Sequence, residues 1–176
     1  MKGKNDLSFF ILATRMLPPV AVVIPIFLMF KNLRLYDNQI GLILAYTAFN
    51  LPFAVWMMKG FLDEIPREYE DAAMVDGYTR WQAIRKVIIP QATSGLAATA
   101  VFSLIVAWNE FAFAVTLTSV KARTAVPGIA SMIGTSGLDW GAITASSVVF
   151  VLPVFLFTFL VRNHLLRGVT FGAVRR

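Results

Sequence analysis

The chain has 176 residues, of which 57% are hydrophobic and only 15% are charged, and its mean hydropathy is +0.68. Soluble domains carry about 25% charged residues, so this composition excludes an ordinary soluble globule and indicates a protein solvated by lipid. The chain contains no cysteine and a single histidine, His164, which excludes disulfides and a metal centre built from thiolates or several histidines. The net charge of +6 does not indicate nucleic acid, because the basic residues flank apolar segments instead of forming a stripe with aromatics.

Four apolar segments are long enough to cross a membrane as helices, which takes about 20 residues. They cover residues 8–30, 40–58, 93–118 and 142–161. The expected fold class is therefore all-α, a polytopic transmembrane helix bundle with four spanning helices. Three of the segments contain proline, at Pro18, Pro19, Pro25, Pro52 and Pro153. Two interpretations stay open: kinks in a bundle that opens and closes, or the ordinary frequency of proline in membrane helices.

The basic residues of the connections predict the orientation in the membrane. Eleven Lys and Arg residues lie in the N-terminus, the loop 59–92 and the C-terminal tail, and four lie in the connections after the first and third segments. An excess of Lys and Arg marks cytoplasmic loops. We therefore expect a multi-pass protein of the cytoplasmic (inner) membrane, with both termini and the loop 59–92 in the cytoplasm.

The loop 59–92 is much longer than the 2–8 residues that usually connect packed helices. Its pattern predicts two short helices. Gly77 is expected to end the first, as glycine often does at a helix C-terminus. Thr79 and Gln82 have the spacing of a capping box and open the second helix, which is expected to stop at Pro90.

The small side chains of Ala72 and Ala73, in the middle of the first helix, predict a narrow ridge that a groove of another protein holds closely. The alternative is an amphipathic helix that lies on the membrane surface. Such helices usually have a basic polar face, whereas the loop 59–92 holds six acidic and five basic residues. The balance of charge favours docking on a protein.

The loop resembles the EAA motif of ABC importer permeases, which reads Glu-Ala-Ala, three residues, Gly, nine residues, and then Ile-x-Leu-Pro. The matching positions are Asp71, Ala72, Ala73, Gly77, Val87, Ile89 and Pro90. Asp71 stands where the family has glutamate, and Glu70 is a second candidate for that role. Other stretches resemble carbohydrate-uptake permeases of the maltose and glycerol-phosphate type: residues 16–19, 56–61, 83–90, 107–111 and 166–174.

This resemblance implies that the loop forms a coupling helix that sits in a cleft of an ATP-binding cassette ATPase subunit. The implied coupling positions are Glu70, Asp71, Ala72, Ala73, Asp76, Gly77, Val87, Ile89 and Pro90. It also implies a second permease subunit in a heterodimer, an extracytoplasmic solute-binding protein, and import of a sugar by alternating access. The chain itself is then no enzyme and binds no cofactor, because the partner subunit uses the ATP. Permeases of this type usually have six crossings, so the first two are expected to be absent from this chain, through truncation or a misassigned start codon.

Polar residues inside the apolar segments are candidates for the translocation pathway, because charges in a membrane are costly and are by default functional. The candidates are Arg15, Trp108, Asn109 and Glu110. Arg15 can instead snorkel to the membrane surface, and the others can serve helix packing. The external loop 119–140 is expected either to meet a solute-binding protein or to form a re-entrant scaffold.

Two other functions stay open. One is an ABC permease for another solute, such as a polyamine or a phosphate ester. The other is a channel or secondary transporter that works without an ATPase. The sequence contains no Walker A motif and no Ser-His-Asp arrangement, so an enzyme is disfavoured.

Overall fold

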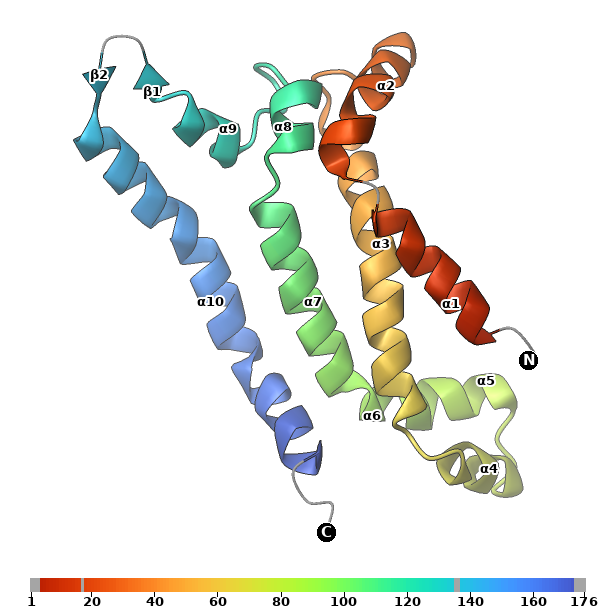
Figure 1. Cartoon of the computed structure of the whole chain (residues 1–176). Helices are drawn as coiled ribbons and strands as arrows, with labels where there is room; N and C mark the ends of the chain where they lie inside the picture. Colours follow the sequence, from red (N-terminus) through yellow and green to blue (C-terminus); the bar gives the residue numbers. More distant parts are fainter. Residues whose placement is uncertain (1–3, 17, 135–136, 173–176) are drawn as a thin grey trace. The chain divides into compact units, whose positions relative to one another are not determined.

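The computed structural model describes residues 4–16, 18–134 and 137–172, and helices make up nearly all of its regular structure (Figure 1). The helices that follow the expected spans are α1 (Lys4–Ala13), α2 (Pro19–Asn32), α3 (Gln39–Asp63), α7 (Thr93–Trp108), α8 (Ala112–Leu117) and α10 (Trp140–Gly172). Between α3 and α7 lie α4 (Glu68–Val75), α5 (Arg80–Ala83), the π-helical turn η2 (Ile84–Ile88) and α6 (Ile89–Gln91), and α9 (Ala125–Ala130) follows α8. The exception to helix is a short antiparallel pair, β1 (Ile133–Gly134) with β2 (Gly137–Leu138), in which Ile133 faces Leu138. The all-α fold class is confirmed.

Two helices, α3 and the part of α10 up to Arg162, are each long and apolar enough to cross a membrane. Two bent helix pairs raise the number of candidate spans to four. The first pair follows from Pro18 and Pro19. Because a proline pushes the residue before it out of the helical region, Pro18 is extended, with φ −61° and ψ 131°. The chain therefore leaves the short 3-10 turn η1 (Thr14–Met16) and starts a new helix at Pro19, so residues 8–30 are not one straight helix.

The expected helix over residues 93–118 is also interrupted, between Trp108 and Ala112. The carboxylate of Glu110 accepts hydrogen bonds from the backbone N–H groups of Phe113 (2.9 Å) and Ala114 (3.1 Å). These amides belong to the first turn of α8, which has no helical partner for them. Glu110 therefore caps a new helix, and the expectation of a continuous span through this position is wrong.

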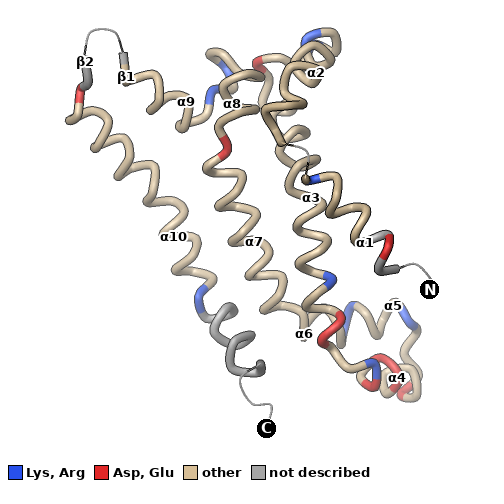
Figure 2. The backbone as a smooth tube through the Cα atoms, in the orientation of Figure 1, with Lys and Arg blue, Asp and Glu red and all other residues tan. Residues whose placement is uncertain are grey.

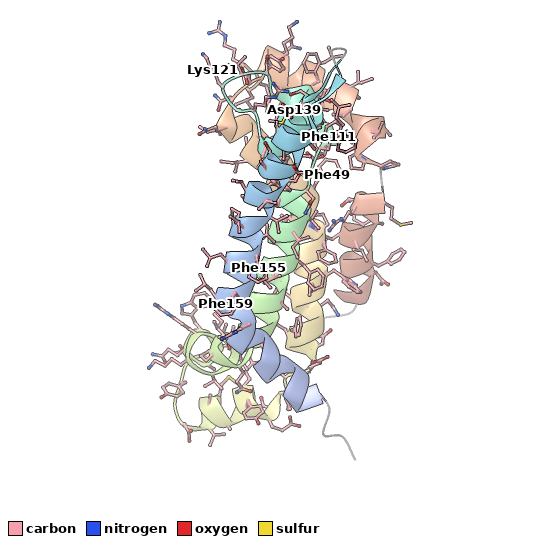
Figure 3. The ribbon with its side chains drawn as sticks, turned by 90° about the vertical axis from the view of Figure 1, so that its left-hand side faces the viewer. Phe49, Phe111, Lys121, Asp139, Phe155 and Phe159 are labelled. Carbon is pink, nitrogen blue, oxygen red and sulfur yellow. The ribbon has the colours of Figure 1, made fainter. Side chains whose placement is uncertain are left out.

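The chain divides into two compact units, one formed by residues 1–53 and 104–156 and the other by residues 54–103 and 157–176. The buried core of the first unit brings together side chains of α2, α3 and α8: Val23, Phe30, Leu42, Ala45, Phe113 and Leu117. The rings of Phe49, labelled in Figure 3, and Phe113 lie 4.4 Å apart, centre to centre. The second unit contains the segment from α4 to α6.

Asp37 joins two connections of the first unit. Its carboxylate accepts hydrogen bonds of 2.8–3.2 Å from four successive backbone N–H groups, those of residues 119–122, and its own N–H donates to the carbonyl of Leu117 at 2.9 Å. Successive N–H groups that point into one concavity favour an anion. These bonds, that from Ser119 above all, hold the pKa of Asp37 well below its usual range.

Replacing Asp37 by asparagine is expected to lower the unfolding temperature near neutral pH, because a neutral amide accepts these bonds less strongly. A depressed pKa stabilises the fold at any pH above the ordinary aspartate value of about 3.9, and this stabilisation is lost as the pH falls toward the pKa of the folded state. The difference between the two proteins should therefore be constant from neutral to mildly acidic pH and should shrink below about pH 4. Thermal unfolding in detergent at several pH values measures it.

Asp139→Asn is the matched control. The carboxylate of Asp139 accepts one backbone N–H, that of Ala142, at the start of α10, and asparagine caps a helix as well as aspartate does. Its unfolding temperature should stay close to that of the unmodified protein. Equal losses in both variants would show that the four-amide arrangement around Asp37 contributes nothing.

Apolar side chains cover much of the surface of α10 up to Arg162. Phe155 is 68% exposed and Phe159 is 48% exposed, and both are labelled in Figure 3. Figure 2 shows that α3, α7 and the described part of α10 are almost free of charged residues, which gather on α4 and α5 and at the ends of helices. This distribution suits helices that face lipid or other membrane helices.

Candidate functional site

The candidate coupling loop forms two short helices, α4 and α5, as expected (Figure 1). Residues 59–63 belong to the end of α3, so the connection itself begins at Glu64. The positions singled out from the motif all lie in this unit, from Glu70 in α4 to Pro90 in α6.

Gly77 ends α4. The Gly77 N–H donates to the carbonyl of Met74 (3.1 Å) and the Tyr78 N–H to the carbonyl of Ala73 (3.1 Å), which are the two bonds of a Schellman motif. Gly77 has a φ of +86°, in the left-handed region that favours glycine. The predicted role of Gly77 as a helix terminator is confirmed.

Thr79 and Gln82 form the predicted capping box at the start of α5. The Gln82 N–H donates to the Thr79 hydroxyl oxygen at 3.3 Å, and the Thr79 N–H donates to Oε1 of Gln82 at 2.9 Å. The two bonds satisfy two of the backbone donors that a helix start leaves unpaired. The turn between α4 and α5 is thus fixed from both sides, by Gly77 and by Thr79.

The expected end of the second helix at Pro90 is wrong. The chain widens into the π turn η2, in which the N–H of Ile89 donates to the carbonyl of Ile84, five residues back. Pro90 has no N–H and sits in the first turn of α6, a position that proline tolerates. The bend comes later, at Ala92, where residues 80–91 and 93–108 form an angle of 67°.

Contacts inside the loop hold α4 against α5 and η2. Ala73 and Ala83 are 5% and 0% exposed, and their small side chains allow the close approach of the two helices. Nε of Arg80 donates to Oε1 of Glu70 at 3.0 Å. At the other end of the segment, Nζ of Lys86 lies 4.8 Å from the ring centre of Tyr78. These contacts join α4, α5 and η2 into one packed element.

The outer surface of the loop carries the remaining motif positions of α4 and of its C-cap, Asp76. Asp71, Ala72 and Asp76 are exposed, and in the described chain the Asp71 carboxylate makes no hydrogen bond or ion pair. Of the two alanines of the predicted ridge, therefore, only Ala72 is accessible, and of the two acidic candidates Glu70 is engaged by Arg80. Val87 is half-buried in η2, and Ile89 and Pro90 are exposed beside the start of α7.

Large apolar side chains on the same loop were not singled out from the sequence. Val75 is 87% exposed and Trp81 is 69% exposed, although both lie in a polar connection. An apolar residue at the exposed end of a short helix is the signal that could have identified them. Aromatic residues such as Trp81 are enriched in protein interfaces, and with the exposed Val75 this residue extends the candidate docking surface beyond the motif.

The predicted pathway residues separate into two pairs. Arg15 and Glu110 line a cavity of about 240 Å³ within the first unit. Trp108 and Asn109 do not line it: Nε1 of Trp108 donates to the carbonyl of Phe150 at 3.0 Å, and Nδ2 of Asn109 donates to the carbonyl of Ile105, in its own helix, at 2.8 Å. The other lining residues are Pro19, Tyr46, Phe49, Asn50, Val106 and Phe113. Tyr46 and Asn50 are also polar residues in an apolar segment, and this signal could have identified them although they were not among the predicted pathway residues.

The chain is similar to several known permeases over nearly its whole length. It is 35% identical to the probable ABC transporter permease protein y4oR of Sinorhizobium fredii, covering 99% of this chain and 63% of the relative. It is 37% identical to the putative ABC transporter permease protein ORF1 of Streptomyces antibioticus, covering 99% of this chain and 76% of the relative. It is 38% identical to the trehalose transport system permease protein SugB of Mycobacterium tuberculosis, covering 98% of this chain and 64% of the relative.

The chain thus spans less than two thirds of the length of y4oR and of SugB. Residues 2–170 match the family described as binding-protein-dependent transport system inner membrane component. The match includes the loop with α4 and α5, both interrupted helices and the cavity. The chain therefore belongs to the family of inner membrane components of binding-protein-dependent transport systems.

Proposed function

We propose that the protein is the permease subunit of an ATP-driven ABC importer and carries a sugar or sugar derivative across the cytoplasmic membrane by alternating access. The observation that supports this most directly is the two-helix loop, whose inner contacts are satisfied and whose outer face exposes Asp71, Ala72 and Val75. A rigid element with an unpaired acidic group and apolar side chains suits docking on another subunit. The proposed partner is the ATP-binding cassette ATPase, which supplies ATP hydrolysis.

The remaining partners follow from the family. Binding-protein dependence supports an extracytoplasmic solute-binding protein, and we propose a second permease subunit that completes the pathway. A sugar is the proposed cargo because a relative, SugB, is named a trehalose transport system permease. The distribution of Lys and Arg supports cytoplasmic termini and a cytoplasmic coupling loop.

Asp71→Arg tests the proposal in the complete transporter. The substitution reverses an exposed charge without removing an internal contact of the loop, so the chain should still insert into the membrane. We expect copurification of the ATPase subunit with this chain to fall tenfold or more, together with uptake of labelled glucose, trehalose or maltose. Uptake measured with and without ATP separates an ATP-driven importer from a channel or a secondary transporter.

Glu64→Arg is the matched control, because Glu64 is an exposed acidic residue of the same connection but lies outside α4. It makes the same change of charge and should leave both readouts near their original values. If Asp71→Arg retains the ATPase and the uptake, the assignment of α4 as the docking helix is wrong.

A further inference from the structure

The cavity of the first unit contains polar groups that the fold leaves without partners. Nη1 of Arg15, the hydroxyl of Tyr46 and Oδ1 of Asn50 are buried and make no hydrogen bond in the described chain. The Tyr46 hydroxyl lies near Glu110 and Thr124 without meeting the geometry of a hydrogen bond to either. Buried polar groups are normally paired, so three unpaired groups on residues that all line one cavity favour an occupant that both donates and accepts hydrogen bonds.

The two charged groups of the cavity are held apart. The guanidinium of Arg15 lies 4.7 Å from the ring centre of Phe53, a cation–π distance. Both carboxylate oxygens of Glu110 accept backbone N–H groups of α8. Because each charge is held by its own surroundings and no ion pair joins them in the described chain, the space between them stays open to a ligand.

The remaining wall is apolar and aromatic. Phe49 and Phe113 form a tilted ring pair, and both line the cavity. A sugar ring has hydroxyl groups around its edge and C–H groups on its faces, so it needs this combination of hydrogen-bonding groups and aromatic surface. The volume of about 240 Å³ is below the range of about 300–1,000 Å³ of sites for drug-sized ligands and has room for one sugar ring.

We propose that this cavity is a subsite for a single sugar ring of the transported solute, with Arg15, Tyr46 and Asn50 bonding its hydroxyl groups. Phe49 packs against the apolar face of the ring, and the buried ring of Phe113 supports Phe49 from behind. The inference rests on the proposed function, because it takes the cargo to be a sugar. It adds that this chain itself contacts the cargo, and it names the contacting residues.

Tyr46→Phe is the first test, in the complete transporter. The substitution removes one buried hydroxyl that bonds nothing in the fold, so a purely structural role predicts unchanged or improved stability and unchanged uptake. A subsite predicts that uptake falls about threefold to tenfold, the effect of one hydrogen bond, with copurification of the ATPase unchanged. Tyr36→Phe is the control, because Tyr36 lies outside the cavity and its ring packs against Phe27.

The second test uses the absence of cysteine from the chain. Asn50→Cys places a single thiol in the cavity, and its reaction with a small charged methanethiosulfonate reagent is followed with and without glucose, trehalose or maltose. A subsite predicts that whichever of these sugars the transporter carries slows the labelling at least threefold. Asn109→Cys lies beside the break in the helix but off the cavity, and its labelling should not respond to sugar.

The outcomes separate the two proposals. Suppose that the transporter takes up a sugar, that this sugar does not slow the labelling of Asn50→Cys, and that Tyr46→Phe transports as well as the unmodified protein. This result overturns the subsite and leaves the importer intact, and the cavity then holds only water. Absence of uptake for every sugar tested overturns the sugar importer and the subsite together. Slower labelling of Asn50→Cys in the presence of a transported sugar, together with reduced uptake in Tyr46→Phe but not in Tyr36→Phe, supports the subsite.

Discussion

Replacing Gly95 by alanine is expected to disrupt the packing of α7 on the end of α3, at the base of the proposed coupling loop. A Cβ atom at Gly95 would lie 2.4 Å from Cγ and 2.5 Å from Cβ of Phe61, so α7 and the end of α3 cannot keep their present separation. Because the Cβ of Phe61 is itself too close, rotation of the phenyl ring does not remove the clash. Overpacking of this kind costs about 1–3 kcal/mol, and a lower unfolding temperature in detergent measures it.

Gly60→Ala is the matched control, since Gly60 lies one residue from Phe61 in the same helix and an added Cβ would meet nothing within 4 Å. Alanine is favoured over glycine in a helix by about 1 kcal/mol, so this variant should be as stable as the unmodified protein or more so. The two variants make the same chemical change at neighbouring sites and should shift the unfolding temperature in opposite directions. A rise in both would show that Phe61 does not pack on Gly95.

The features predicted correctly from the sequence are those set by neighbouring residues. The helix end at Gly77 follows from the one residue type that favours a positive φ. The capping box at Thr79 and Gln82 follows from a fixed spacing of side chain and backbone. Apolar length and the scarcity of charge were enough for the all-α membrane fold. Each of these signals lies within a short stretch of chain.

The features that were missed depend on distant residues or on competing local forces. The interruption after Trp108 was hidden because apolar residues continue on both sides and only the carboxylate of Glu110 marks the new helix start. Pro90 was expected to end a helix, but the chain forms a π turn before it and Pro90 lies in the first turn of α6, where the missing N–H of proline is tolerated. The hydrogen bonds between Asp37 and residues 119–122 join positions more than 80 residues apart, and no periodicity of the sequence predicts such a pairing.

The cavity also shows which features of a candidate site depend on tertiary packing. Polar residues in apolar segments identified Arg15 and Glu110 as candidates, and both of these residues line the cavity. The same signal also selected Trp108 and Asn109, which bond backbone carbonyls instead. Sequence shows that a polar group lies in a membrane segment, whereas tertiary packing decides whether that group faces a cavity or a backbone.

The substitution expected to affect transport most is Gly77→Val, because it acts on the geometry of the proposed coupling loop. An added Cβ would meet no atom within 4 Å at Gly77, so the whole effect comes from the backbone, whose φ of +86° is a genuine outlier for a β-branched residue. A left-handed conformation costs an ordinary residue about 1–2 kcal/mol, a change of about 5–30-fold in the population of the native turn. The chain can relieve this strain only by breaking the hydrogen bonds that the Gly77 and Tyr78 N–H groups donate to Met74 and Ala73. The direction of α5 relative to α4 then changes.

A series at Gly77 distinguishes this explanation from simple crowding. Asparagine tolerates the left-handed region, alanine less well and valine least, so uptake and ATPase copurification should fall in the order Gly77→Asn, Gly77→Ala, Gly77→Val. Hydrogen exchange at the Tyr78 amide, which bonds the carbonyl of Ala73, should accelerate in the same order. Equal uptake in all three variants would show that the direction of α5 relative to α4 is irrelevant to transport. Because Gly77 does not line the cavity of the first unit, the series should lower uptake while it leaves the sugar protection of Asn50→Cys intact.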